Sequence, residues 1–191
     1  MSDSGTALTE GQLAEFLGTA TLILIKTTRL GVIPCKKTSD CLISKRWTYC
    51  DANIDHMLPA MQPNQLAPVS SYQLQNVKGT TFREMALAAL KAASDMPFDR
   101  ISTMLKEHRL TCTLPTIEQL VERQERGEDV GLRTDGYSNF AFVENAEGSV
   151  SVLYVCRYDR RWSGRLLSLG GGKGWDAGGR LLLCNSDALT L

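Results

Sequence analysis

Three cysteines and one histidine lie close together in the chain, with a spacing that would suit a metal ion. Cys35, Cys41, Cys50 and His56 are separated by five, eight and five residues, and three thiolates with one imidazole are a known tetrahedral ligand set for zinc. The set contains no Cys-x-x-Cys pair, which would sharpen the signal. We therefore favour the alternative without a cofactor, in which these cysteines are small apolar side chains.

The same stretch carries residue types that suit nucleic acid. Basic side chains can follow phosphates, and aromatic rings can stack on unpaired bases. Three nearby aspartates, Asp40, Asp51 and Asp55, offset much of this positive charge. A nucleic-acid-binding module built on residues 35–56, with or without zinc, is one of two functional hypotheses. Its basic and aromatic residues are Lys36, Lys37, Lys45, Arg46, Trp47 and Tyr49.

The other hypothesis, which we prefer, is a protein-binding surface nearer the C-terminal end. Residues 157–180 contain six basic side chains against two acidic ones. Trp, Tyr and Arg are the residue types that dominate the energetics of protein interfaces. A core position for the tryptophans is the alternative, because Trp is usually mostly buried. The expected contact residues are Tyr158, Arg160, Arg161, Trp162, Arg165, Lys173 and Trp175.

Catalytic residues are not evident in the chain. Cys112 and His108 come nearest to a nucleophile and its base, but the helix that carries His108 should end before Cys112, so the spacing does not fix their geometry. The glycine-rich segment 170–179 lacks the G-x-x-x-x-G-K-[ST] pattern of a phosphate-binding loop. The sequence therefore favours a non-enzymatic binding protein.

Three helices are expected in the middle of the chain. Apolar residues spaced at i, i+3, i+4, i+7, i+8 and i+11 predict an amphipathic helix over residues 82–93. A second helix should begin near Pro97 with Asp95 as its cap, and a third should begin at Leu114. The third helix carries acidic residues that would repel DNA and that we expect to form a solvated face: Glu118, Glu122, Glu125, Glu128 and Asp129.

Strands are expected on both sides of these helices. Residues 139–143 and 149–158 predict a hairpin, and residues 162–169 and 180–184 extend it to an antiparallel meander of three to four strands. Near the N-terminus, residues 19–26 predict a buried strand, followed by short strands at 30–33, 41–43, 46–49 and 72–77. The predicted fold is α+β, in which the C-terminal meander packs against about three helices and is preceded by short N-terminal strands.

Three prolines in residues 58–69 predict a linker or a long surface loop. We expect one domain over residues 1–191. The alternative is a subdivision at 58–71, which would separate a mixed region, 1–57, from the helices and sheet of 72–191.

The overall composition is that of an ordinary globular protein, with 43% hydrophobic and 22% charged residues in 191. Lys plus Arg and Asp plus Glu both number 21, so the total charge favours no anionic partner and we expect no membrane partner. We expect a cytoplasmic protein with reduced cysteines, of undefined oligomeric state. Two short stretches, Leu8–Leu13 and Asp135–Phe140, resemble small phage or bacterial accessory proteins, a resemblance that implies no activity.

Overall fold

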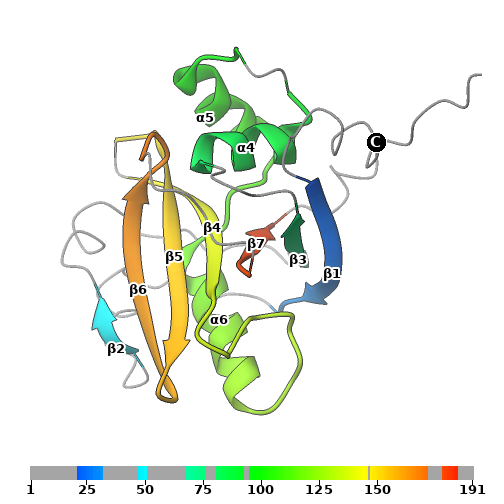
Figure 1. Cartoon of the computed structure of the whole chain (residues 1–191), viewed down its shortest axis with the longest axis vertical. Helices are drawn as coiled ribbons and strands as arrows, with labels where there is room; N and C mark the ends of the chain where they lie inside the picture. The colour runs from blue at the N-terminus through cyan, green and yellow to red at the C-terminus, as the bar shows by residue number, and fades with distance from the viewer. Residues whose placement is uncertain are drawn as a thin grey trace, which may run out of the picture.

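Three helices and a seven-stranded, mostly antiparallel sheet make up the described part of the chain (Figure 1). This part comprises residues 21–31, 47–50, 68–75, 81–92, 95–145, 147–171 and 178–184 of a computed structural model. The fold is α+β, as the sequence predicts.

The strands lie in the order β1-β3-β7-β4-β5-β6-β2 across the sheet. β4, β5 and β6 pair antiparallel as consecutive neighbours, which confirms the predicted meander. β3 begins at a proline, which a sheet tolerates at the first position of a strand, so the proline-rich segment ends sooner than predicted. The strands are β1 (Thr21–Arg29), β2 (Trp47–Cys50), β3 (Pro68–Gln75), β4 (Ser138–Glu144), β5 (Val150–Tyr158), β6 (Arg161–Ser168) and β7 (Arg180–Leu183).

The position of β7 differs from the prediction. It does not pair with β6 as a fourth meander strand but lies between β3, to which it is antiparallel, and β4, to which it is parallel. Residues 169–179 are too many for a tight hairpin. Leu181, Leu182 and Leu183 are each at most 1% exposed, and such burial on both faces requires a central position in the sheet.

The helices begin close to where the sequence predicts. α4 (Phe82–Leu90) opens with a capping box between Thr81 and Glu84, in which each side chain satisfies a free backbone amide. α6 (Leu114–Glu125) is capped by Thr113. Asp95 does not cap α5 (Phe98–Glu107), because that helix begins directly after Pro97 without a side-chain cap.

The sheet is covered by helices on both faces. Alternate residues of a strand point to opposite faces. Phe140 and Phe142 of β4 pack in one cluster with buried residues of α4 and α5, whereas Ala141 and Val143 pack in another with buried residues of α6. The predicted packing of the first helix on the C-terminal sheet is therefore confirmed.

β1 is an edge strand, although the sequence predicts a buried one. It pairs only with β3 among the described strands. Ile23, Leu24 and Ile25 are 39%, 54% and 44% exposed. A strand with apolar residues on both faces is usually buried, but here the partner needed on its outer side is missing from the described residues. No described helix is long and apolar enough to cross a membrane.

A loop after α6 connects β1 and β3 to the rest of the fold. Lys26 of β1 forms a 3.1 Å ion pair with Asp129, and Ser71 of β3 donates a 2.7 Å hydrogen bond to the Gly131 carbonyl. Gly131 has a φ of 82°, and a Cβ there would lie 2.9 Å from the Ser71 Cβ. Only glycine fits this position without displacing the strand.

We expect Asp129→Asn to lower the free energy of unfolding at neutral pH and to have no effect in acid. The hydrogen bond from Lys26, helped by the Gly131 amide, holds the pKa of Asp129 below its usual value. Its stabilising effect is therefore present above about pH 4 and is lost as the pH falls through the lowered pKa. Both side chains are exposed, so the loss should stay below about 1 kcal/mol.

Urea unfolding at neutral pH and at about pH 2, well below the usual pKa of an aspartate, measures this difference. The control is Glu107→Gln, whose 3.8 Å contact with Arg100 lies between two side chains that are more than half exposed. It should change little at either pH. An Asp129→Asn effect that persists in acid would show that the loss does not come from the charge.

Candidate functional site

The β5–β6 hairpin ends in a strained two-residue turn. Asp159 and Arg160 connect the last strand pair, Tyr158 and Arg161, and have φ values of 48° and 63°. Two consecutive positive φ values define a type I′ turn, which is normally filled by Asn-Gly. A left-handed conformation costs a non-glycine residue roughly 1 kcal/mol. Such strain, when it persists, is often associated with function.

The tip of this hairpin presents an aromatic ring and positive charge to solvent. Tyr158 is 73% exposed, and Arg160, Arg161 and Arg165 are all exposed. Within the described residues, Arg160 and Arg161 form no ion pair. Four of the seven sequence-predicted contact residues therefore lie on one exposed surface, which we call the hairpin surface: Tyr158, Arg160, Arg161 and Arg165.

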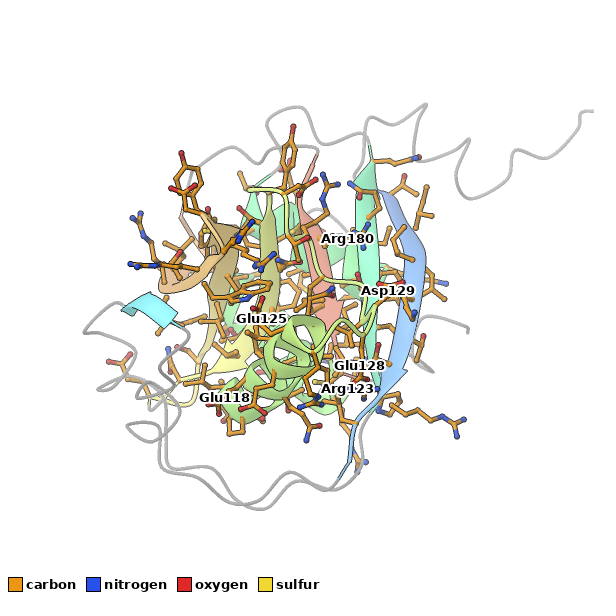
Figure 2. The ribbon with its side chains drawn as sticks, turned by 90° about the horizontal axis from the view of Figure 1, so that it is seen from below. Glu118, Arg123, Glu125, Glu128, Asp129 and Arg180 are labelled. Atoms are coloured by element: carbon orange, nitrogen blue, oxygen red, sulfur yellow. The ribbon has the colours of Figure 1, made fainter. Side chains whose placement is uncertain are left out.

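Trp162 lies in the core, behind the hairpin surface. Its side chain is fully buried, and its Nε1 donates a 3.0 Å hydrogen bond to Glu125. Figure 2 labels Glu125 at the end of α6. The same carboxylate oxygen lies 3.0 Å from the Nε of Arg157. Of the two positions considered for this tryptophan, surface and core, the structure places it in the core.

The acidic residues in and directly after α6 are not simply solvated, which corrects the prediction. Glu118 is only 4% exposed, and Glu125 accepts the hydrogen bond from Trp162 and forms the ion pair with Arg157. Glu128 accepts a 2.6 Å hydrogen bond from Arg123, which is the main cause of its lowered pKa. The prediction failed because Glu125 pairs with Trp162 and Arg157, which are distant in the sequence, and Glu128 pairs with Arg123, which the sequence did not single out as a partner.

The two surfaces predicted from the sequence meet at one edge of the sheet. β2, which belongs to the basic and aromatic stretch 35–56, pairs in parallel with β6. Trp47 lies in register with Trp162, and Cys50 with Gly164. Figure 1 shows β2 beside β6 at the outer edge of the sheet. The hairpin surface and the second candidate segment are therefore neighbours.

Several predicted residues lie outside the described part of the chain. These are Lys173 and Trp175 of the contact set, and Cys35, Cys41 and His56 of the zinc set. Cys50, in β2, has only its backbone described. Among the described residues, no three or more His, Cys, Asp or Glu side chains are grouped to hold a metal ion. The zinc hypothesis therefore stays untested.

Cys112 is a buried thiol with an unreactive environment. It is 3% exposed and lies 3.7 Å from the Leu182 carbonyl. Burial, together with the neighbouring Cys184, raises the pKa of its thiol well above the usual value. Cys112 is therefore protonated at neutral pH, and the thiol form is a poor nucleophile.

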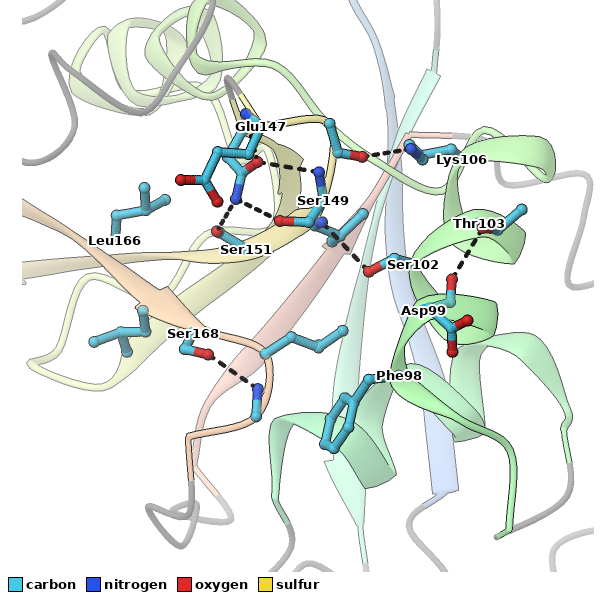
Figure 3. Close-up of a pocket in the computed structure, with 16 residues that line it drawn as sticks. Phe98, Asp99, Ser102, Thr103, Lys106, Glu147, Ser149, Ser151, Leu166 and Ser168 are labelled. Atoms are coloured by element: carbon cyan, nitrogen blue, oxygen red, sulfur yellow. Dashed lines mark hydrogen bonds between the residues drawn. The ribbon is translucent and has the colours of Figure 1, made fainter.

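A pocket lies at the opposite end of the β5–β6 hairpin, with a volume of about 720 Å³. α5, the β4–β5 turn and the end of β6 form its walls (Figure 3). The eight or so residues from Val150 to Tyr158 separate it from the hairpin surface by roughly 25 Å, at 3.3 Å per residue. The pocket and the hairpin surface are therefore separate candidate sites.

Asn145 organises the polar wall of this pocket. It is 5% exposed. Its Oδ1 accepts hydrogen bonds of 3.1 Å from the amides of Glu147 and Ser149. Its Nδ2 donates to the hydroxyl oxygens of Ser149 at 2.8 Å and Ser151 at 3.1 Å. The turn is therefore built around one amide side chain, and both serine hydroxyls are fixed beside the pocket.

No known protein family, curated protein or solved structure matches this chain. Its function has to be argued from its own residues. The sequence did not reveal the pocket, because residues 98–106, 145–151 and 166–170 come together only in the folded chain. The one local signal was the turn sequence around Asn145, since Asn often bonds to the backbone two residues ahead.

Proposed function

We propose that this chain is a non-enzymatic binding protein that contacts an acidic protein partner through the hairpin surface. The observation that carries the proposal is the exposed, positively charged tip of a strained turn. Tyr158 supplies a large rigid contact area, and Arg160 and Arg161 supply charge that no described acid neutralises. Tyr and Arg are enriched among the residues that dominate interface affinity.

The hairpin surface is held rigid from behind. Glu125 of α6 accepts a hydrogen bond from Trp162 of β6 and forms an ion pair with Arg157 of β5, so the strands under the tip are tied to a helix. A pre-organised surface loses less conformational entropy on binding than a flexible loop. Contacts made by residues that are already ordered therefore contribute more to the free energy of binding.

A nucleic-acid partner is the second candidate, favoured by the pairing of β2 with β6. This pairing places the chain segment 47–50 beside the hairpin strands. A combined surface would offer arginines to phosphates and aromatic residues to unpaired bases. Binding would then weaken steeply as the salt concentration rises.

The test compares capture of partners from a host lysate by the wild type and three variants. Arg161→Glu should weaken binding of the captured partner about tenfold, because it reverses a charge in the contact. Arg160→Gly should weaken binding while it raises the free energy of unfolding by about 1 kcal/mol, since glycine relieves the positive φ. Arg100→Glu on α5 is the matched control and should bind as the wild type does.

Nuclease treatment before capture separates the two candidates. A protein that is captured after nuclease treatment, and is lost with Arg161→Glu, supports the preferred proposal. Loss of all capture after nuclease treatment favours the nucleic-acid alternative. Equal capture by Arg161→Glu, Arg100→Glu and the wild type would remove the hairpin surface from consideration.

A further inference from the structure

We propose that the pocket between α5, the β4–β5 turn and the end of β6 binds a neutral saccharide. This site is separate from the hairpin surface and serves a different class of ligand. The inference rests on the hydroxyl groups of the pocket, its charge and its apolar floor.

The hydroxyl protons of four pocket serines remain available to a ligand. Each oxygen already accepts a hydrogen bond from the protein: Ser102 from the Val150 amide, Ser168 from the Gly170 amide, and Ser149 and Ser151 from Asn145. A serine hydroxyl carries one proton that it can still donate. None of the four donates to another described residue. The pocket therefore offers several directed neutral donors.

The charged residues of the pocket oppose an anion. Asp99 and Glu147 line it, with Lys106 as the one cationic lining residue. The Lys106 ammonium is already engaged, because it donates to the Gly148 carbonyl and lies 3.9 Å from the Glu144 carboxylate. A phosphate or carboxylate ligand would meet two uncompensated carboxylates. Neutral hydroxyl groups, by contrast, can donate to those carboxylates and accept from the serines.

An apolar floor lies beneath these polar groups. Val150 and Leu169 belong to the core, Leu167 packs against it half-buried, and all three line the pocket. Phe98, at the rim, is 45% exposed, and the Arg83 guanidinium lies 5.3 Å from its ring centroid. A sugar ring has hydroxyl groups at its edge and apolar C–H groups on its faces. It matches a pocket whose walls are polar and whose floor is apolar.

The pocket size fits the same class. Small-molecule sites generally measure about 300–1,000 Å³, and this pocket has a volume of about 720 Å³. That space accommodates a monosaccharide or a disaccharide. A few placed polar groups over an apolar base are the usual composition of a specific ligand site.

The experiment is saturation-transfer NMR of the full chain with three kinds of probe at millimolar concentration. The neutral probes are glucose, galactose, mannose, N-acetylglucosamine and their β-1,4-linked disaccharides. The cationic probe is spermidine, and the anionic probe is inorganic phosphate. We expect transfer to at least one neutral saccharide and no comparable binding of the two charged probes.

Two variants place the binding in the pocket. Asp99→Asn removes a carboxylate acceptor, and Phe98→Ala removes the exposed ring. Each should weaken saccharide binding about tenfold or more. Both residues are exposed, so neither change should alter the fold, which the thermal unfolding midpoint checks. Glu107→Gln, on the same helix but outside the pocket, should bind as the wild type does.

Three results would overturn the proposal. The first is the absence of transfer to every neutral saccharide. The second is saccharide binding that Asp99→Asn and Phe98→Ala leave unchanged. The third is tighter binding of spermidine or phosphate than of any saccharide, with loss of that binding in the pocket variants. Because the hairpin variant Arg161→Glu leaves the pocket intact, its saccharide binding should equal that of the wild type.

Discussion

Trp162→Ala should lower the free energy of unfolding by about 3–5 kcal/mol, the range measured when a large buried aromatic is removed. Trp162 is fully buried in the cluster that joins α6 to the sheet. The substitution removes its apolar surface and its hydrogen bond to Glu125. This loss is a large fraction of the total stability of a small domain, which is about 5–15 kcal/mol. Urea titration measures the loss.

Trp162→Phe is the matched comparison. It keeps an aromatic ring in the cluster but removes the indole N–H, while Arg157 continues to hold the Glu125 carboxylate. The expected loss is about 1–2 kcal/mol, from the missing hydrogen bond and the smaller ring. If Trp162→Ala instead kept full stability and abolished partner capture, Trp162 would be a contact residue and its buried position would be contradicted.

Asn139→Ala should be the second severe substitution, with a loss of about 3 kcal/mol. Asn139 is fully buried. Its Oδ1 accepts a 2.7 Å hydrogen bond from the Arg133 amide, and its Nδ2 donates to the Arg133 and Val155 carbonyls at 3.1 and 3.3 Å. Removing the side chain leaves buried backbone groups without a partner, at about 1–3 kcal/mol each.

The loop that leads into β4 should also loosen in Asn139→Ala. Arg133 pairs with Asp135 and lies over the Tyr137 ring, but these exposed contacts are too weak to replace the lost hydrogen bonds. Urea unfolding measures the stability, and limited proteolysis measures access to residues 133–137. Glu144→Gln, an exposed change on the same strand, should stay within about 0.5 kcal/mol of the wild type. A similar loss in both variants would contradict this role of Asn139.

The sequence predicted the elements whose signals are local. The apolar stripe that begins at Phe82 became α4, because helical spacing is a signal carried by a few neighbouring residues. The β4–β5–β6 meander followed from β-branched and aromatic residues separated by turn residues. In α4 and in the meander, the residues whose pattern predicts the element also lie next to one another in the folded element.

The sequence did not predict features that depend on distant partners. β1 has apolar residues on both faces, so burial was inferred, yet its neighbours in the sheet place it at an edge. β7 was assigned to the meander because it follows β6 in the chain. Its three leucines suit the centre of the sheet equally well, and only the pairings with β3 and β4 distinguish the two positions.

The candidate sites also combine features that local sequence signals predict with features that depend on distant partners. Tyr158, Arg160 and Arg161 were recognised as a set because they are adjacent in the chain. Trp162 follows them directly but points into the core, since neighbours on a strand face opposite sides. The carboxylate that holds it, Glu125, is 37 residues away, and no local pattern indicates that pairing.

The central position of β7 also sets the order in which the chain can fold as it is synthesised. β1 and β3 can pair early, and the β4–β5–β6 meander can form once residue 168 has been made. These two parts of the sheet share no strand until residues 180–183 join them. Ribosome-bound chains that end before this point therefore carry two incomplete sheets with open inner edges, and such edges are sites of misassembly. The final cooperative step must wait for one of the shortest strands of the sheet.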